Sequence, residues 1–133
     1  MDASQDSSAL RNQLRQLLAA RPEIDFAYLF GSFADELPYH DIDVAVFLQP
    51  APAPSAIFDY EMELSVQLTL AVHVSVDVHV LNGAPAGFQH AALQGELLLV
   101  RDEDRLTDFI ERVGHEVMEF AHHAETYLRE VLS

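Results

Sequence analysis

The sequence predicts a small α/β (α+β) domain built on a mixed sheet of about four strands, with helices packed on one face of the sheet. Segments with the apolar spacing of helices alternate along the chain with short runs typical of strands. Half of the 133 residues are hydrophobic, which is enough for a core, and no repeat or long linker divides the chain. We therefore expect one domain over residues 1–133, with its core at 8–101 and a long final helix at about 102–132.

The first half of the chain predicts a helix, two strands and a second helix. Leucines at helical spacing predict the first helix over 8–20. Two runs rich in aromatic and β-branched residues predict strands over 25–31 and 42–48, because such side chains suit a pleated, partly buried surface. A proline-rich connection follows, and the segment after it predicts a helix over 55–71.

The clearest strand pattern lies in the middle of the chain. Between 72 and 81 valines alternate with polar residues, and a period of two predicts a strand with one apolar and one polar face. Asn82-Gly83 then predicts a turn. The rest is expected as a helix over about 85–94, a strand over 96–101 and a helix over 102–132. The order α-β-β-α-β-α-β-α is typical of a small α/β or α+β domain.

The chain is strongly acidic. It carries 22 acidic residues and 7 arginines but no lysine, which gives a net charge of −15. A nucleic-acid-binding protein needs a basic surface to displace counterions from phosphates, so the composition argues against direct binding to DNA or RNA. The acidity favours a basic protein partner, or a small ligand whose charge a metal neutralises. Greater solubility is the alternative explanation.

Several other features narrow the class of protein. The chain has no cysteine, which excludes disulfides and thiolate chemistry. Its N-terminal residues lack the basic and apolar regions of a secretory signal. No apolar stretch reaches the roughly 18 residues that suggest a membrane-spanning helix. We therefore expect a cytoplasmic protein that does not act on a membrane.

Polar residues gather at the ends of the first two predicted strands. Gly31 and Ser32 end the first strand, where a glycine lets the backbone approach a ligand and the N–H groups after it can face a phosphate. Asp41 and Asp43 open the second strand, and residues two apart on a strand point to the same side. Taken singly, the Gly-Ser pair also fits an ordinary turn, and the two aspartates also fit a solvated strand end.

Asp77 adds a third carboxylate on the polar side of the valine-rich strand. Aspartate is disfavoured inside strands, so its presence there requires an explanation. If the two strands are neighbours, Asp77 shares one face with Asp41 and Asp43, and repulsion among them raises a pKa unless a cation lies between them. Carboxylates are hard ligands that Mg²⁺ commonly shares with substrate phosphates. An exposed aspartate on an edge strand is the alternative.

The combination of Gly-Ser, Asp-x-Asp on the next strand and Asp on a third strand resembles the nucleotidyltransferase superfamily of the polymerase-β type. Within it, the size and the element order resemble the minimal nucleotidyltransferases, which are the MNT-domain antitoxins that pair with HEPN-domain toxins. The resemblance covers about residues 8–100 and implies a small polymerase-β-like fold.

The resemblance also implies roles for the polar residues. Gly31 and Ser32 would bind the phosphates of ATP. Asp41 and Asp43 would hold Mg²⁺, with two ions per site, and Asp77 would share the catalytic metal and accept the proton of an incoming hydroxyl. That hydroxyl would belong to a tyrosine of a basic, helical HEPN ribonuclease. AMP placed there would repel an RNA phosphate and so neutralise the toxin, with which the chain would form a hetero-oligomer.

The sequence departs from the family pattern in the loop between Ser32 and Asp41. The loop is short and carries Asp35 and Glu36 instead of the arginine that is usual there, so acids lie near the expected triphosphate. His40 stands where a small polar residue is common. These differences bear on nucleotide affinity and turnover more than on the fold.

Two histidines are additional site candidates. His79 follows Asp77 on the same side of its strand and His40 adjoins Asp41, so each could contact a metal or phosphate. An exposed histidine without a role is the alternative for both. The final helix carries an apolar stripe that fits core packing up to about Phe120, and beyond that point it fits either core packing or a protein interface.

Three functions fit the chain. The first is an antitoxin that transfers AMP from ATP to a tyrosine of its HEPN toxin. The second is an antitoxin that neutralises its toxin by binding alone, which the acidic loop favours. The third is a transferase acting on a small hydroxylated molecule such as an aminoglycoside, although the chain has little room for the helical domain that such enzymes usually add.

Overall fold

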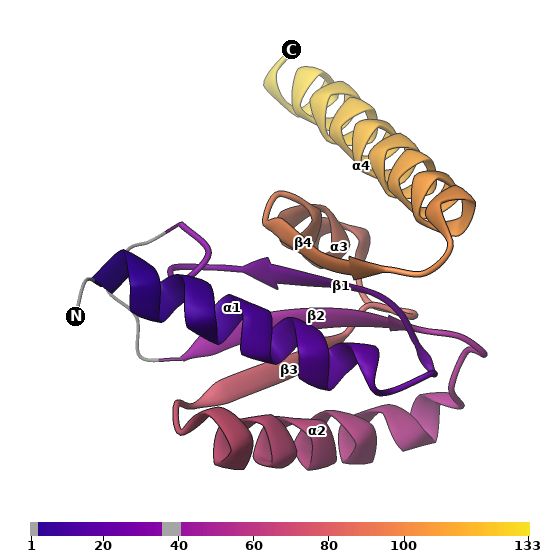
Figure 1. The fold of residues 1–133 in the computed structure, drawn as a ribbon. Helices are drawn as coiled ribbons and strands as arrows, with labels where there is room; N and C mark the ends of the chain where they lie inside the picture. Colours follow the sequence, from indigo (N-terminus) through magenta and orange to yellow (C-terminus); the bar gives the residue numbers. More distant parts are fainter. Residues whose placement is uncertain (1–2, 36–40) are drawn as a thin grey trace.

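In the computed structural model, which describes residues 3–35 and 41–133, four α-helices and four strands follow the predicted order (Figure 1). The helices are α1 (Ala3–Ala19), α2 (Ile57–Val72), α3 (Ala86–Leu93) and α4 (Glu103–Leu132). The strands are β1 (Ile24–Phe30), β2 (Ile42–Leu48), β3 (Val76–Val80) and β4 (Glu96–Val100). A short 3₁₀ turn at Pro54–Ala56 leads into α2. The predicted element order is therefore confirmed.

The sheet is mixed and has the strand order β3-β2-β1-β4. β1 runs antiparallel to both β2 and β4, whereas β2 and β3 are parallel because α2 crosses over between them. In the parallel pair, the register places Asp43 beside Asp77 and Ala45 beside His79. The two strands that were predicted to carry the acidic residues are therefore direct neighbours.

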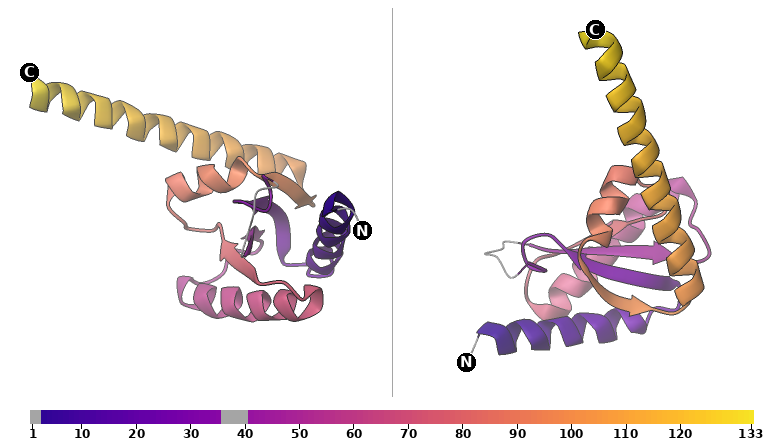
Figure 2. Two further views of the ribbon diagram at one scale, coloured as in Figure 1. Left: turned by 90° about the vertical axis from the view of Figure 1, so that its left-hand side faces the viewer. Right: turned by 90° about the horizontal axis from the view of Figure 1, so that it is seen from above.

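Helices cover both faces of the sheet, which corrects the prediction that they pack on one face. α1 and α2 lie on one side, and α3 and α4 lie on the other (Figure 2). The reason is visible in β1, where Ala27 and Leu29 belong to the core under α1 and α2, while Phe26 and Tyr28 belong to the core under α3 and α4. The nearly continuous apolar run of β1 is typical of a strand covered on both faces, whereas the prediction of one covered face followed the polar alternation of the segment 72–81.

The strand predicted over 72–81 begins later than expected, at Val76. Val72 is the last residue of α2 and is buried in the same core as the strand valines. His73 ends the helix in the left-handed conformation, with φ of 61°, so the chain turns before it enters the strand. Val74 packs against that core from the connecting turn. The alternation of valines therefore extends beyond the strand because both sides of the turn face one core.

Side chains of α2 close the outer edge of the sheet. Three backbone N–H groups of the edge strand β3 donate to side-chain oxygens that recur at every fourth residue along α2. These bonds join Val76 to Thr69, Val78 to Ser65 and Val80 to Glu61, at 2.9, 2.9 and 2.8 Å. An open row of N–H groups is a template for pairing with another chain, so these bonds protect the edge.

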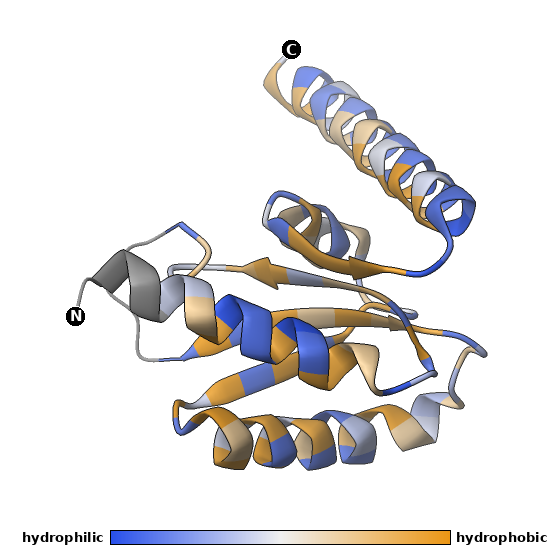
Figure 3. Ribbon diagram, in the orientation of Figure 1, coloured by the Kyte–Doolittle hydropathy of each residue, from blue (hydrophilic) through white to orange (hydrophobic). Residues whose placement is uncertain are grey.

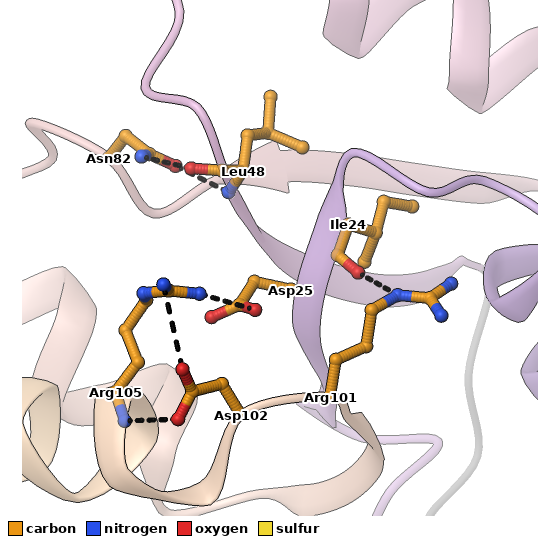
Figure 4. Close-up of polar contacts among 7 residues, drawn as sticks. All are labelled: Ile24, Asp25, Leu48, Asn82, Arg101, Asp102 and Arg105. Atoms are coloured by element: carbon orange, nitrogen blue, oxygen red, sulfur yellow. Dashed lines mark hydrogen bonds and ion pairs between the residues drawn. The ribbon is translucent and has the colours of Figure 1, made fainter.

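Polar side chains fix the ends of the central strands (Figure 4). Asn82, in the predicted turn after β3, accepts from the Leu48 N–H at 2.8 Å and donates to the Leu48 carbonyl at 2.9 Å, as a further strand residue would. Arg105, in the first turn of α4, donates to Asp25 at 2.9 Å. Asp25 is only 4% exposed, and Asp102 caps α4 by accepting from the Arg105 N–H. These bonds anchor α4 against the beginning of β1.

α4 extends well beyond the rest of the domain (Figure 2). Its first half buries Leu106, Phe109 and Val113, and Val117 packs against the same core. With 30 residues, the helix is about 45 Å long, so its second half outruns the sheet. In residues 3–35 and 41–133, no helix combines the length and the apolar character that a membrane crossing requires.

Candidate functional site

Asp43, Asp77 and His79 lie on one face of the sheet, near the end at which β2 and β3 begin. Asp43 and Asp77 are register partners, and His79 follows two residues later on the same side of β3. Val76 and Val78, which flank Asp77, point to the opposite face and are buried under α1 and α2. The strand alternation thus brings two carboxylates and an imidazole together on the α3 side of the sheet.

The three side chains are close enough to share a cation. His79 Nε2 lies 3.2 Å from Asp77 Oδ2 and 3.8 Å from Asp43 Oδ1. One ligand atom from each residue lies within 4.8 Å of the others. The side chain of Asp77 is 57% exposed and that of Asp43 is 29% exposed, so the group is open to solvent on one side. Carboxylate oxygens at this spacing suit a divalent cation such as Mg²⁺.

The protonation of Asp43 is perturbed by this environment. Partial burial raises the pKa of Asp43 above its ordinary value of 3.8. The charges of Asp77 and Asp41 raise the pKa further, against the opposing effect of His79. A carboxylate surrounded by like charges is one that a bound cation would stabilise. The role predicted for Asp43 as a metal ligand therefore has an electrostatic basis.

Gly31 lies directly beside Asp43. Its φ is 80°, and a β-carbon at this position would lie 2.6 Å from Asp43 Oδ2. Only glycine fits there without displacing the carboxylate or straining the backbone. The turn continues with the half-buried Ser32 and includes a hydrogen bond of 3.2 Å from the Asp35 N–H to the Gly31 carbonyl. The predicted Gly-Ser pair therefore adjoins the acidic cluster.

Two predicted residues lie at the margin of this geometry or outside the described part of the chain. Asp41 is exposed and directly precedes β2, and it acts on the cluster through the effect of its charge on the pKa of Asp43. The compact group of possible ligands contains Asp43, Asp77 and His79 and does not include Asp41. His40 lies outside the described residues. The structure thus brings together Asp43, Asp77 and His79, with Asp41 adjacent to them.

Two phenylalanines that the sequence does not single out enclose His79. The ring of Phe30, at the end of β1, lies 5.7 Å from the imidazole, and the ring of Phe88, on α3, lies 5.4 Å from it. The two phenylalanine rings are 5.7 Å apart. These contacts restrict the orientations that the imidazole can take beside Asp77. For Phe30, the only sequence signal of a place near the site was its position next to Gly31. No sequence pattern indicates that Phe88 packs against His79.

A polar hollow of about 510 Å³ opens beside the turn that contains Ala34 and Asp35. Arg11 of α1 lines it, and its Nε donates to Glu96 at 2.7 Å. The Arg11 guanidinium also donates to the Phe33 carbonyl at 3.4 Å and lies 4.8 Å above the Phe33 ring. Arg11 therefore holds the turn after Gly31 from α1. Sequence reasoning missed Arg11 because α1 is distant from this turn in the chain.

Solved structures of toxin–antitoxin systems have the same fold over nearly the whole chain. A chain of a tri-AMPylated Shewanella oneidensis HEPN toxin in complex with MNT antitoxin is 22% identical, with a TM-score of 0.70 and coverage of 96% of this chain and 99% of that one. A toxin–antitoxin structure with AMP-PNP contains a chain that is 21% identical, with a TM-score of 0.72 and coverage of 92% and 98%. A chain of an MntA–HepT structure is 20% identical, with a TM-score of 0.69 and coverage of 95% and 99%. These likenesses confirm the fold.

Sequence comparisons supply the family. No curated protein matches the chain significantly. The family model described as Polymerase beta, Nucleotidyltransferase matches residues 12–104, a range that includes the Gly31 turn and all the acidic residues of the cluster. Because this match spans well over half of the chain, the protein belongs to the polymerase-β-type nucleotidyltransferase family.

Proposed function

We propose that this chain is an MNT-type antitoxin that transfers AMP from ATP to a tyrosine hydroxyl of a HEPN-type toxin and thereby neutralises it. The observation that carries the proposal is the pairing of Asp43 with Asp77 beside Gly31. Support also comes from toxin–antitoxin structures with this fold, one with AMP-PNP and one with a tri-AMPylated toxin. In this proposal residues 1–133 form one domain with its core at 8–101, and the protein acts in the cytoplasm in a complex with the toxin.

The residues present fit divalent metal ions. Asp41, Asp43 and Asp77 offer carboxylate oxygens, which are the ligands that Mg²⁺ prefers, and the raised pKa of Asp43 marks a charge that a cation would relieve. We assign two Mg²⁺ to these carboxylates, with His79 as a further candidate ligand. Such ions, when bound, neutralise the charge of the triphosphate and of the leaving group.

The chain's own residues position the reactants. The N–H groups of the turn after Gly31 and the hydroxyl of Ser32 bind the β- and γ-phosphates. Asp77 is the more exposed of the two paired aspartates and takes the proton of the tyrosine hydroxyl as its oxygen attacks the α-phosphorus. The bond from the α-phosphorus to the oxygen that bridges to the β-phosphorus breaks. AMP remains on the tyrosine, and pyrophosphate leaves.

The proposal is tested with the product of the neighbouring gene, which under this proposal is a HEPN-type toxin co-expressed with this chain. We would incubate the purified toxin with this chain, ATP and Mg²⁺, measure pyrophosphate release and locate the added AMP by peptide mass mapping. We expect one pyrophosphate for each AMP found on tyrosine, and no release after metal chelation. Pyrophosphate release without any modified toxin residue would contradict the proposed acceptor, because the AMP would then have passed to water or to a hydroxyl of this chain.

Binding without catalysis is the second candidate function. The exposed Asp35, in the turn that follows Gly31, favours it because an acid at this place repels a triphosphate. A stable complex with the toxin, formed without pyrophosphate release, would select this function over AMP transfer.

A further inference from the structure

The apolar stripe that packs α4 onto the domain continues along the same helix face into solvent. Leu106, Phe109 and Val113 are buried, whereas Phe120 and Tyr127 further along are 74% and 64% exposed. This part of α4 projects from the domain, and hydrophobic residues recur along it (Figures 2 and 3). We call this continuation the distal seam, which begins at the partly buried Val117 and includes Phe120, Ala124, Tyr127, Leu128 and Val131.

The distal seam has the spacing of a helix–helix contact. Positions 117, 120, 124, 127 and 131 follow alternating steps of three and four residues, which is the a and d pattern of a heptad. Ala121 and Leu128 occupy the adjacent e positions and widen the apolar face. A two-stranded coiled coil uses the a and d positions alone, whereas a helix that packs into a bundle is apolar at a third position as well. The face therefore fits a groove between two helices.

The charges beside the distal seam argue against a second copy of this chain as the occupant. Glu116 and Glu130 occupy g positions along one side of the seam. In an antiparallel pair of α4 helices, the g positions of the two copies face each other, so the glutamates would repel. The net charge of −15 on each copy adds to that repulsion. A helical partner with basic residues at the facing positions would complement these glutamates.

We propose that the distal seam is the docking surface for a pair of helices of a basic partner protein. The identity of that partner rests on the proposed function, under which it is the HEPN-type toxin. Docking itself does not depend on AMP transfer, because the distal seam contains none of the residues of the Asp43–Asp77 cluster. The two activities are therefore separable by mutation.

Two apolar residues of α4 provide a matched test. Phe120 lies in the distal seam and Met118 lies off it, and both side chains are 74% exposed. The affinity of each glutamate variant for the co-expressed HEPN-type toxin would be measured by titration calorimetry. We expect Phe120→Glu to weaken binding about tenfold or more, because it places a charge in an apolar contact. Met118→Glu is expected to bind within about twofold of the wild type, since its surroundings remain in water.

Three outcomes would overturn the inference. One is Phe120→Glu binding the toxin as tightly as the wild type, and another is a wild-type chain that does not bind the toxin at all. The third is a wild-type chain that sediments alone as a dimer, which Phe120→Glu dissociates and Met118→Glu does not, since a second copy would then occupy the seam. An Asp41→Asn/Asp43→Asn variant separates the two proposals. If this variant loses AMP transfer but binds the toxin with unchanged affinity, docking does not require the acidic cluster.

Discussion

Gly31 and Asp43 are so close that a β-carbon on Gly31 would lie 2.6 Å from a carboxylate oxygen of Asp43. This contact joins the turn after β1 to the acidic cluster on β2. The position of a proposed metal ligand therefore depends on a residue that has no side chain. A side chain at position 31 would therefore displace the carboxylate of Asp43.

Gly31→Ala is expected to lower AMP transfer by about 10- to 100-fold, because a small displacement of reacting groups is costly in a preorganised site. The variant also forces an alanine into a left-handed backbone conformation. Gly83→Ala is the matched control, since Gly83 has a φ of 72° and no atom within 4 Å of an added β-carbon. Steady-state assays and thermal melts of both variants separate backbone strain from the contact with Asp43. Equal activity in the two variants would argue against the contact.

Asp43→Asn is expected to stabilise the metal-free protein at neutral pH. The folded state raises the pKa of Asp43, so its carboxyl favours folding below 3.8 and this contribution is lost as pH rises through the raised pKa. The melting temperature of the variant should therefore exceed that of the wild type at pH 7, and the two should converge at pH values below 3.8. Added Mg²⁺ should stabilise the wild type more than the variant. Asp108→Asn on the exposed side of α4 serves as the control, and a wild type that is more stable than Asp43→Asn without metal would refute the argument.

Arg105→Met is expected to destabilise the fold by about 1.5–3 kcal/mol, because it removes the charged hydrogen-bond partner of the buried Asp25. Adding Asp25→Asn should recover part of this loss. Urea unfolding of the single and double variants measures both effects. Arg112→Met removes an exposed pair with Glu116 and should change stability by less than about 0.5 kcal/mol. A double variant no more stable than Arg105→Met would show that the charge of Asp25 is not the cause.

Ser65→Ala is expected to cost about 1 kcal/mol and to open part of the sheet edge, because the Val78 N–H loses its acceptor. Amide hydrogen exchange at Val78 should accelerate, while exchange at Val44, in the interior of the sheet, should change only with global stability. Unchanged exchange at Val78 relative to Val44 would mean that water replaces the hydroxyl without consequence.

Much of the fold and the centre of the site could be predicted from local patterns. The alternation of valines around Asp77 defined its face, and the approach of Asp77 to Asp43 was predicted on the condition that the two strands are neighbours, which the structure confirms. β1 was recognisable as a strand from its aromatic-rich, apolar composition.

The remaining features depend on contacts between distant segments. Phe88 encloses His79 and Arg11 holds the turn after Gly31, and both come from helices whose positions no periodicity specifies. The second helical layer was missed because the polar face of the valine-rich strand suggested a sheet with one solvated side, although the apolar run of β1 is typical of a strand covered on both faces. The late start of β3 was missed because Val72 faces the core from a helix.

The central claim is that the carboxylates beside Gly31 transfer AMP to the toxin. The most direct measurement is the intact mass of the HEPN-type toxin after incubation with ATP, Mg²⁺ and either the wild-type chain or its Asp41→Asn/Asp43→Asn variant. The account predicts that the toxin gains one or more AMP groups with the wild type and none with the variant, while both chains still bind it. A toxin that stays unmodified in a stable complex with the wild type would contradict the account, as would a toxin that the variant modifies equally well.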